Sequence, residues 1–117
     1  MRLEKINADF SVCKITDISG VDFSRPFVFM SKTDEELSLV CESTRVPECV
    51  TDIEDGWKAF RIAGTLDFSL VGIVAKLTTI LAEEGISVFV ISTYNTDYIL
   101  VKAHNFEKAL RILGEAI

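Results

Sequence analysis

Apolar residues recur at helical spacing in one stretch of the chain and place a single hydrophobic face there. The positions concerned are Leu70, Ile73, Val74, Leu77, Ile80 and Leu81. Asp67 is suited to cap the first turn, because its carboxylate can accept a backbone N–H two or three residues later. Gly85 stands where a left-handed C-cap is needed. The pattern therefore predicts an amphipathic helix that begins after Asp67 and ends before Gly85.

Apolar and β-branched segments on both sides of this helix predict strands. Residues 57–63 precede the helix, and two further strands follow it over residues 86–92 and 98–103, separated by a polar turn at 93–97. A last helix follows Asn105, with an apolar stripe formed by Phe106, Ala109, Leu110 and Leu113. This half of the chain thus reads strand, helix, strand, strand, helix.

The first half of the chain contains four weaker strand candidates. They cover residues 3–7, 10–16, 27–31 and 36–42, and the turn at 32–35 joins the last two into a hairpin. Residues 43–49 allow a short helical turn, limited by Pro47. Residues 51–56 are acidic and predict a turn.

The two halves show a degenerate internal similarity. Residues 27–31 match residues 88–92 at an offset of 61 (88 − 27 = 61), and residues 39–40 fall on 100–101 at the same offset. Residues 22–24 repeat as residues 67–69, at an offset of 45 (67 − 22 = 45). A duplication whose first copy has lost its first helix explains both offsets, although matches this short also arise by chance.

The order of elements is most of a split βαβ pattern, the ferredoxin-like arrangement. Residues 3–7 can supply the final strand that the second copy lacks. The predicted fold is α+β: tandem βαββαβ units with an antiparallel sheet and helices on one face, the first unit degenerate and lacking its first helix. We place a degenerate unit at residues 1–56 and a complete one at residues 57–117, possibly exchanging strands within one compact body.

Size and charge narrow the class of protein. The chain has 117 residues, of which 49% are hydrophobic, so it can bury a core. Its net charge of −6 argues against a nucleic acid as partner. No apolar run reaches membrane-spanning length and no leader pattern precedes a cleavage site, so we expect a cytoplasmic protein without a membrane partner. Cys13, Cys41 and Cys49 lack metal-ligand spacing and read as reduced structural thiols.

Three segments together resemble the ACT domain family: residues 66–73, residues 82–89 and above all residues 91–101. The subclass resembled is the small bacterial tandem-ACT proteins related to the ACT repeats of the animal cytosolic arginine sensor. The resemblance implies a non-catalytic regulatory module that binds an amino acid near the loop after the first strand and the N-terminus of the first helix. The chain departs from a regular tandem because residues 24–27 leave no room for the first helix of the first copy.

The start of the central helix is the first candidate binding site. Its free backbone N–H groups and the positive end of the helix dipole suit a carboxylate, and Gly72 permits close approach to the backbone. The alternative is that Asp67 and Ser69 only cap the helix and Gly72 only permits packing. The candidate residues here are Asp67, Phe68, Ser69, Leu70, Val71, Gly72 and Ile73.

The turn between the last two strands is the second candidate. Asp97 can pair with an ammonium or a guanidinium, and Thr93 and Asn95 can help to orient it. The alternative is an ordinary hairpin turn, in which Asn and Asp are favoured anyway.

Enzyme interpretations have less support. His104 is the only histidine and has no nucleophile arranged beside it, residues 52–55 form an acidic turn, and no phosphate-binding glycine loop is present. We therefore expect no catalytic residue, cofactor or metal. The competing hypothesis is a protein-interaction module without a ligand. We also expect a homodimer, because one sheet face lacks helices and Trp57, Phe89 and Tyr98 are available for burial.

Overall fold

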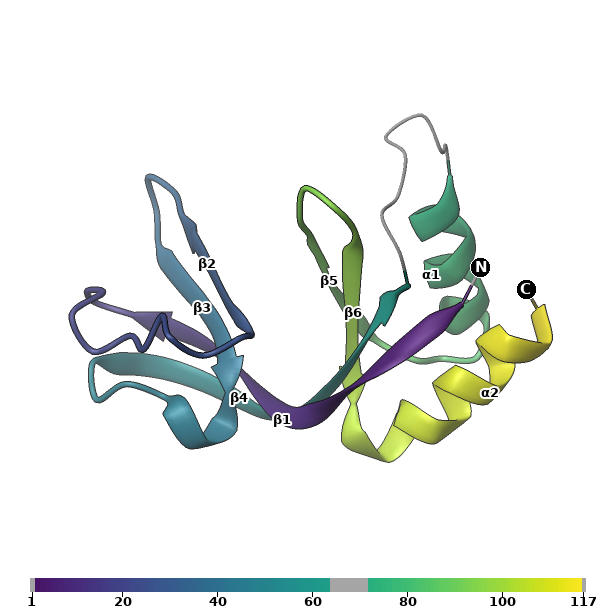
Figure 1. The fold of residues 1–117 in the computed structure, drawn as a ribbon, viewed down its shortest axis with the longest axis horizontal. Helices are drawn as coiled ribbons and strands as arrows, with labels where there is room; N and C mark the ends of the chain where they lie inside the picture. Colours follow the sequence, from purple (N-terminus) through teal and green to yellow (C-terminus); the bar gives the residue numbers. More distant parts are fainter. Residues whose placement is uncertain (1, 64–71, 117) are drawn as a thin grey trace. The chain divides into compact units, whose positions relative to one another are not determined.

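The computed structural model describes residues 2–63 and 72–116. The chain divides into two compact units: unit 1 comprises Met1–Asn7 and Lys58–Ile117, and unit 2 comprises Ala8–Trp57. Six strands are hydrogen-bonded in the order β2-β3-β1-β4-β6-β5 (Figure 1). The two long strands, β1 (Leu3–Ile15) and β4 (Val50–Ile62), contribute one half to each unit. The α+β class with an antiparallel sheet is confirmed.

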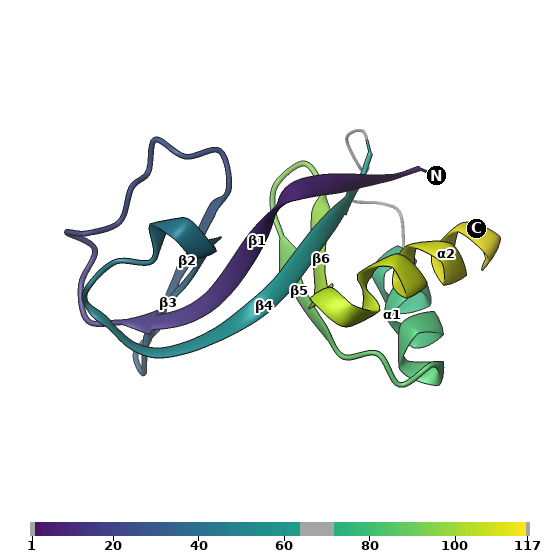
Figure 2. The same cartoon turned by 90° about the horizontal axis from the view of Figure 1, so that it is seen from below.

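Unit 1 contains both α-helices. After β4, the chain continues through α1 (Ile73–Glu83), β5 (Val88–Ser92), β6 (Asp97–Lys102), the 3-10 turn η2 (Ala103–Asn105) and α2 (Phe106–Ala116). The two helices lie side by side on one side of the unit 1 strands (Figure 2). Their buried residues, including Leu77, Leu81 and Leu113, pack with Ile62 of β4 and Ile99 of β6 into one core. Helices on one face of the sheet are therefore observed in this unit.

Helix α1 ends as predicted and begins later than predicted. Its C-terminus is closed by Gly85, which has a φ of 70°. The amide of Gly85 bonds to the carbonyl of Ala82, and the amide of Ile86 bonds to that of Leu81, each over 3.0 Å. At the other end the N-cap is Gly72 and not Asp67. The segment around Asp67 lies outside the described residues.

Unit 2 contains β2 (Val28–Lys32), β3 (Leu37–Glu42) and the 3-10 turn η1 (Ser43–Arg45), together with its halves of β1 and β4. No α-helix occurs between Ala8 and Trp57, a range that the structure describes throughout. The predicted absence of a first helix is thus observed, and the only helical segment in this range is the 3-10 turn η1. A small core of Cys13, Ile15, Leu39 and Cys41 is covered by partly buried side chains, Val21 and Val46 among them.

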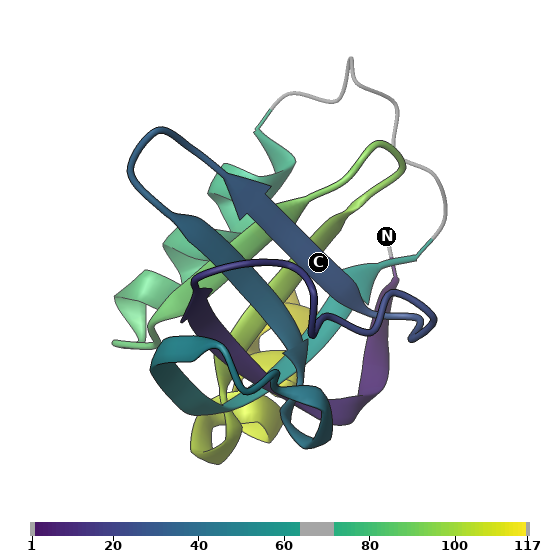
Figure 3. The ribbon, with the colours of Figure 1, turned by 90° about the vertical axis from the view of Figure 1, so that its left-hand side faces the viewer.

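A helix-free crossover, residues 16–27, connects β1 to β2 in unit 2 (Figure 3). Val21 on this crossover packs against the unit 2 core. Its start is held by the amide of Thr16, which donates to the carbonyl of Cys49 over 3.2 Å. Gly20 fits because a Cβ there would lie 3.1 Å from Cβ of Pro47.

Two predictions in the first half were wrong, one about separate strands and one about a turn. The candidates at residues 3–7 and 10–16 are one continuous strand, β1. Residues 51–56 are not a turn but the first half of β4, although all six are exposed. This half of β4 is held by its neighbour β1, as the bond from Thr51 Oγ1 to the carbonyl of Lys14 (3.2 Å) illustrates. An exposed strand carries no apolar alternation, so the local sequence did not reveal it.

The two hairpins correspond at an offset of 60, not 61. Val28 lies opposite Cys41 in unit 2, and Val88 lies opposite Val101 in unit 1 (88 − 28 = 60; 101 − 41 = 60). A shift of one residue moves every side chain to the other face of a strand, so the two alignments are structurally different. Consecutive apolar residues in β5 concealed the error, because they match apolar residues of β2 in either register.

Candidate binding site

The turn between β5 and β6 is fastened to the end of β4. Within the turn, the amide and the hydroxyl of Thr93 both donate to the carbonyl of Thr96, over 2.8 and 2.9 Å. Thr96 is only 8% exposed, and its own hydroxyl donates to the carbonyl of Ile62 over 2.8 Å. Because Ile62 is the last residue of β4, this bond keeps the turn beside the strand end that leads into residues 64–71.

Asp97 begins β6 at the base of this turn. It lies directly opposite Ser92, and the Ser92 hydroxyl donates to Asp97 Oδ1 over 2.5 Å. Asp97 is half-buried, whereas Thr93 and Asn95 are exposed. A carboxylate that is partly shielded from water and oriented by a neighbouring hydroxyl is a suitable acceptor for an ammonium or a guanidinium.

The N-terminus of α1 lies at the same end of unit 1 as this turn, on the upper side of Figure 1. The N-cap Gly72 has a φ of 80°, and no side chain among the described residues makes a capping hydrogen bond there. Its carbonyl accepts the first helical hydrogen bond, from the amide of Lys76 over 2.8 Å. A helix start without a side-chain cap leaves backbone N–H groups that can bind an anion.

The predicted site residues fall into three groups. The structure brings Gly72, Ile73, Thr93 and Asp97 to one end of unit 1. Asn95 lies in the same turn, exposed, as the turn-forming interpretation predicts. The remaining candidates, Asp67, Phe68, Ser69, Leu70 and Val71, lie outside the described residues.

Sequence reasoning missed Ser92 and Thr96. Ser92 was placed in a strand, and Thr96 was read as part of a polar turn. Their roles depend on what stands opposite or beside them: Ser92 faces Asp97 across the hairpin, and Thr96 reaches the end of β4. The only local signal was a run of hydroxyl residues around the turn.

An ion-pair network occupies another part of unit 1. Arg61 Nε donates to Glu4 Oε1 over 2.6 Å, and Arg61 Nη1 donates to the Tyr98 hydroxyl over 3.1 Å. The guanidinium also lies 5.8 Å from the centre of the Tyr98 ring. The hydrogen bonds to Tyr98 and then to Glu4 raise the pKa of Arg61. These groups satisfy one another, so we assign them to sheet structure and not to a binding site.

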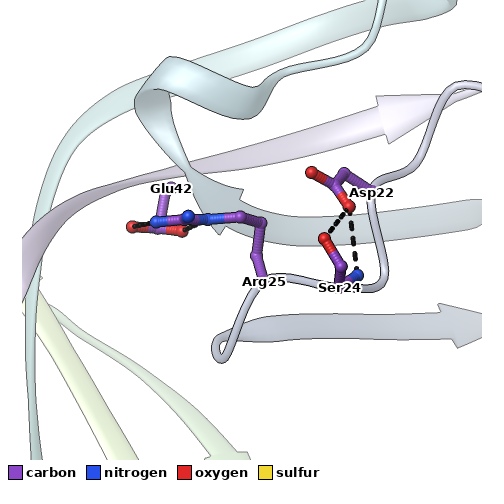
Figure 4. Close-up of polar contacts among 4 residues, drawn as sticks. All are labelled: Asp22, Ser24, Arg25 and Glu42. Carbon is purple, nitrogen blue, oxygen red and sulfur yellow. Dashed lines mark hydrogen bonds and ion pairs between the residues drawn. The ribbon is translucent and has the colours of Figure 1, made fainter.

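The first copy of the repeated tripeptide forms a local turn in unit 2. The Asp22 carboxylate accepts the backbone N–H of Ser24 over 3.0 Å and its hydroxyl over 2.5 Å (Figure 4). These bonds, led by that of the hydroxyl, lower the pKa of Asp22. The neighbouring Arg25 holds Glu42 through two bonds of 2.7 and 3.1 Å, which fasten the end of the crossover to β3. These contacts explain residues 22–25 as a structural turn, so we assign no ligand to them.

The described residues also lack the patterns of metal sites, disulfides and membrane-spanning helices. None of their His, Cys, Asp and Glu side chains form a group of three that could hold a metal ion. Cys13, Cys41 and Cys49 are free thiols. Among the helices of the described chain, none has the length and apolar character needed to cross a membrane.

Comparison with known proteins identifies the family. The model of an ACT domain matches residues 52–115, more than half of the chain. The chain belongs to the ACT domain family. No match was found among curated proteins.

Several solved structures show the same fold. Protein Atu0741 from Agobacterium tumefaciens is 31% identical over 97% of this chain and 87% of its own, with a TM-score of 0.85. Protein VC0802 from Vibrio cholerae, described as a possible transport protein of unknown function, is 27% identical with the same coverage and a TM-score of 0.75. The regulatory subunit of aspartate kinase from Thermus thermophilus shares the fold at 10% identity and a TM-score of 0.66, over 100% of this chain and 98% of its own.

Proposed function

We propose that this ACT protein is a non-catalytic regulatory module that binds a small amino acid at the turn end of unit 1. The Asp97 carboxylate would receive the ammonium or a basic side chain. The start of α1, at Gly72 and Ile73, would receive the carboxylate. The observation that carries the proposal is the bond from buried Thr96 to Ile62, because it keeps Asp97 at the strand end from which the chain passes to α1.

The neighbours of known role support this class of function. One is the regulatory subunit of aspartate kinase from Thermus thermophilus, and another, from Porphyromonas gingivalis, is described as a possible C-terminal regulatory domain of that enzyme. At 10% and 16% identity they share the fold alone. We extend the proposal to the tandem subclass: unit 2 would be a degenerate ACT-like unit that has lost its helices. We further propose a cytoplasmic location, with no nucleic acid or membrane as partner.

We also propose that the protein forms a homodimer. The outermost strand β5 supports this, because residues 88–91 are uncharged and only half-buried at a sheet edge. An apolar edge strand without charged residues readily pairs with another strand. Light scattering at micromolar concentration should give twice the monomer mass of 13.0 kDa, and the monomer mass would contradict the proposal.

A panel of the twenty amino acids at millimolar concentration tests the binding function by thermal shift. A ligand that binds only the folded state stabilises it by RT ln(1 + [L]/Kd), about 1.4 kcal/mol at tenfold excess over Kd. At least one amino acid should raise the melting temperature of the wild type, and calorimetry should confirm the binding. The same amino acid should have little effect on the Asp97→Asn variant, which keeps the side-chain shape and removes the charge. A flat panel in both assays would favour an interaction module without a ligand.

A further inference from the structure

We infer that the Ser92–Asp97 pair is the element that selects a cationic group, and that each chain therefore binds one ligand, in unit 1 only. This inference rests on the proposed function and adds the specificity-determining pair and the stoichiometry. It is drawn from a comparison of two hairpins that share a backbone and differ in chemistry.

The hairpins of the two units have the same construction. At the offset of 60, the strand pairings coincide residue for residue over the five pairs of each hairpin. The turns coincide as well, since Thr33 N donates to the carbonyl of Glu36 as Thr93 N donates to that of Thr96. The burial patterns of β3 and β6 are also identical along their length. Any difference between the two hairpins in what they bind must therefore come from their side chains.

The pair at the base of each turn differs in charge. In unit 1 Ser92 faces Asp97, and among the described side chains only Ser92 donates a hydrogen bond to that carboxylate. In unit 2 Lys32 faces Leu37 at the same two positions. An ammonium at this place in unit 2 would meet the apolar side chain of Leu37, whereas in unit 1 it would meet the carboxylate of Asp97. It would also lie beside the positive charge of Lys32, which repels it.

The acidic residues of the unit 2 turn do not replace Asp97. Asp34, Glu35 and Glu36 are exposed, so water and salt screen their charges. Glu36 stands at the position of Thr96, the buried residue that anchors the unit 1 turn. Unit 2 has no α-helix, so it also lacks a helix N-terminus to receive a carboxylate. Both halves of the proposed site are thus missing from unit 2.

Calorimetric titration tests the inference with the amino acid that binds from the panel of twenty. The wild type should bind one molecule per chain. The double variant Ser92→Lys/Asp97→Leu installs the unit 2 pair in unit 1, and it should weaken binding at least about tenfold, because it removes a partly buried charge pair. The matched control Lys32→Ser/Leu37→Asp changes the same positions in unit 2 and should leave the affinity of unit 1 within about twofold of the wild type.

Two analogues of the bound amino acid separate the charged groups. Asp97→Asn should weaken binding of the decarboxylated amine at least about tenfold and should leave binding of the analogue without the amino group nearly unchanged. Asp97→Asn also serves if the double variant does not fold. Two ligands per chain, or an unchanged affinity in a folded Asp97→Asn variant, would overturn the inference and leave amino-acid binding standing. If no amino acid binds the wild type, the proposed function fails and this inference fails with it.

Discussion

The hydroxyl of Thr96 offers a sharp test of how the candidate site is held together. Thr96→Val keeps the branched shape and removes the donor to the carbonyl of Ile62. Both residues are buried, at 8% and 1% exposure, so water cannot easily take the place of the lost bond. A buried acceptor left without its donor costs about 1–3 kcal/mol. The added methyl group recovers up to about 0.8 kcal/mol by burial. The net loss in the free energy of unfolding therefore lies between about 0.2 and 3 kcal/mol, and we expect a value near the middle, about 1–2 kcal/mol.

Thr51→Val is the matched control. Thr51 also donates its hydroxyl to a carbonyl of the neighbouring strand, that of Lys14 over 3.2 Å, but it is exposed. Water can replace this bond, so the control should change stability by less than about 0.5 kcal/mol. Urea unfolding of the three proteins, with thermal melting as a second measure, gives the comparison. Equal losses in the two variants would refute the conclusion that burial makes the Thr96 bond important.

Three further predictions concern the cores and the crossover. Leu77→Ala should cost about 2–5 kcal/mol of unfolding free energy in urea, because Leu77 is fully buried between the helices and the sheet. The hydrogen bond from Arg25 lowers the pKa of Glu42 in the folded protein. The ionised pair therefore stabilises the fold at a pH above the ordinary glutamate pKa, and this stabilisation is lost as the pH falls through the lowered pKa of Glu42. Glu42→Gln should remove that part of the acid dependence of melting, and an unchanged pH profile would contradict it. Burial raises the pKa of Cys41 to about 12 and also raises that of buried Cys13, so both remain unreactive thiols in the folded protein. An aromatic disulfide reagent should therefore label only half-buried Cys49 rapidly before unfolding. Rapid labelling of all three thiols in the folded protein would be the contrary result.

Local sequence determined most of the secondary-structure elements. The spacing of Leu77 and Leu81 on α1 reflects a single buried face, and Gly85 ends that helix because its left-handed conformation closes the last turn. Both hairpins were predicted to within a residue or two of β2, β3, β5 and β6, because apolar strands bounded by polar turns leave a local pattern. Asp97 was singled out because a carboxylate in a polar turn before an apolar strand is unusual enough to notice.

Tertiary structure alone decided the features that depend on a distant partner. The first half of β4 is a strand because β1 lies beside it, although residues 51–56 are all exposed. The correspondence of the hairpins at 60 was settled by which residues stand opposite one another, since a run of apolar residues in β5 matches in two registers. Thr96 became a structural anchor only when its hydroxyl met the carbonyl of Ile62, 34 positions away in the chain. Periodicity reports the environment of one element, whereas pairing and burial are set by the elements that pack against it.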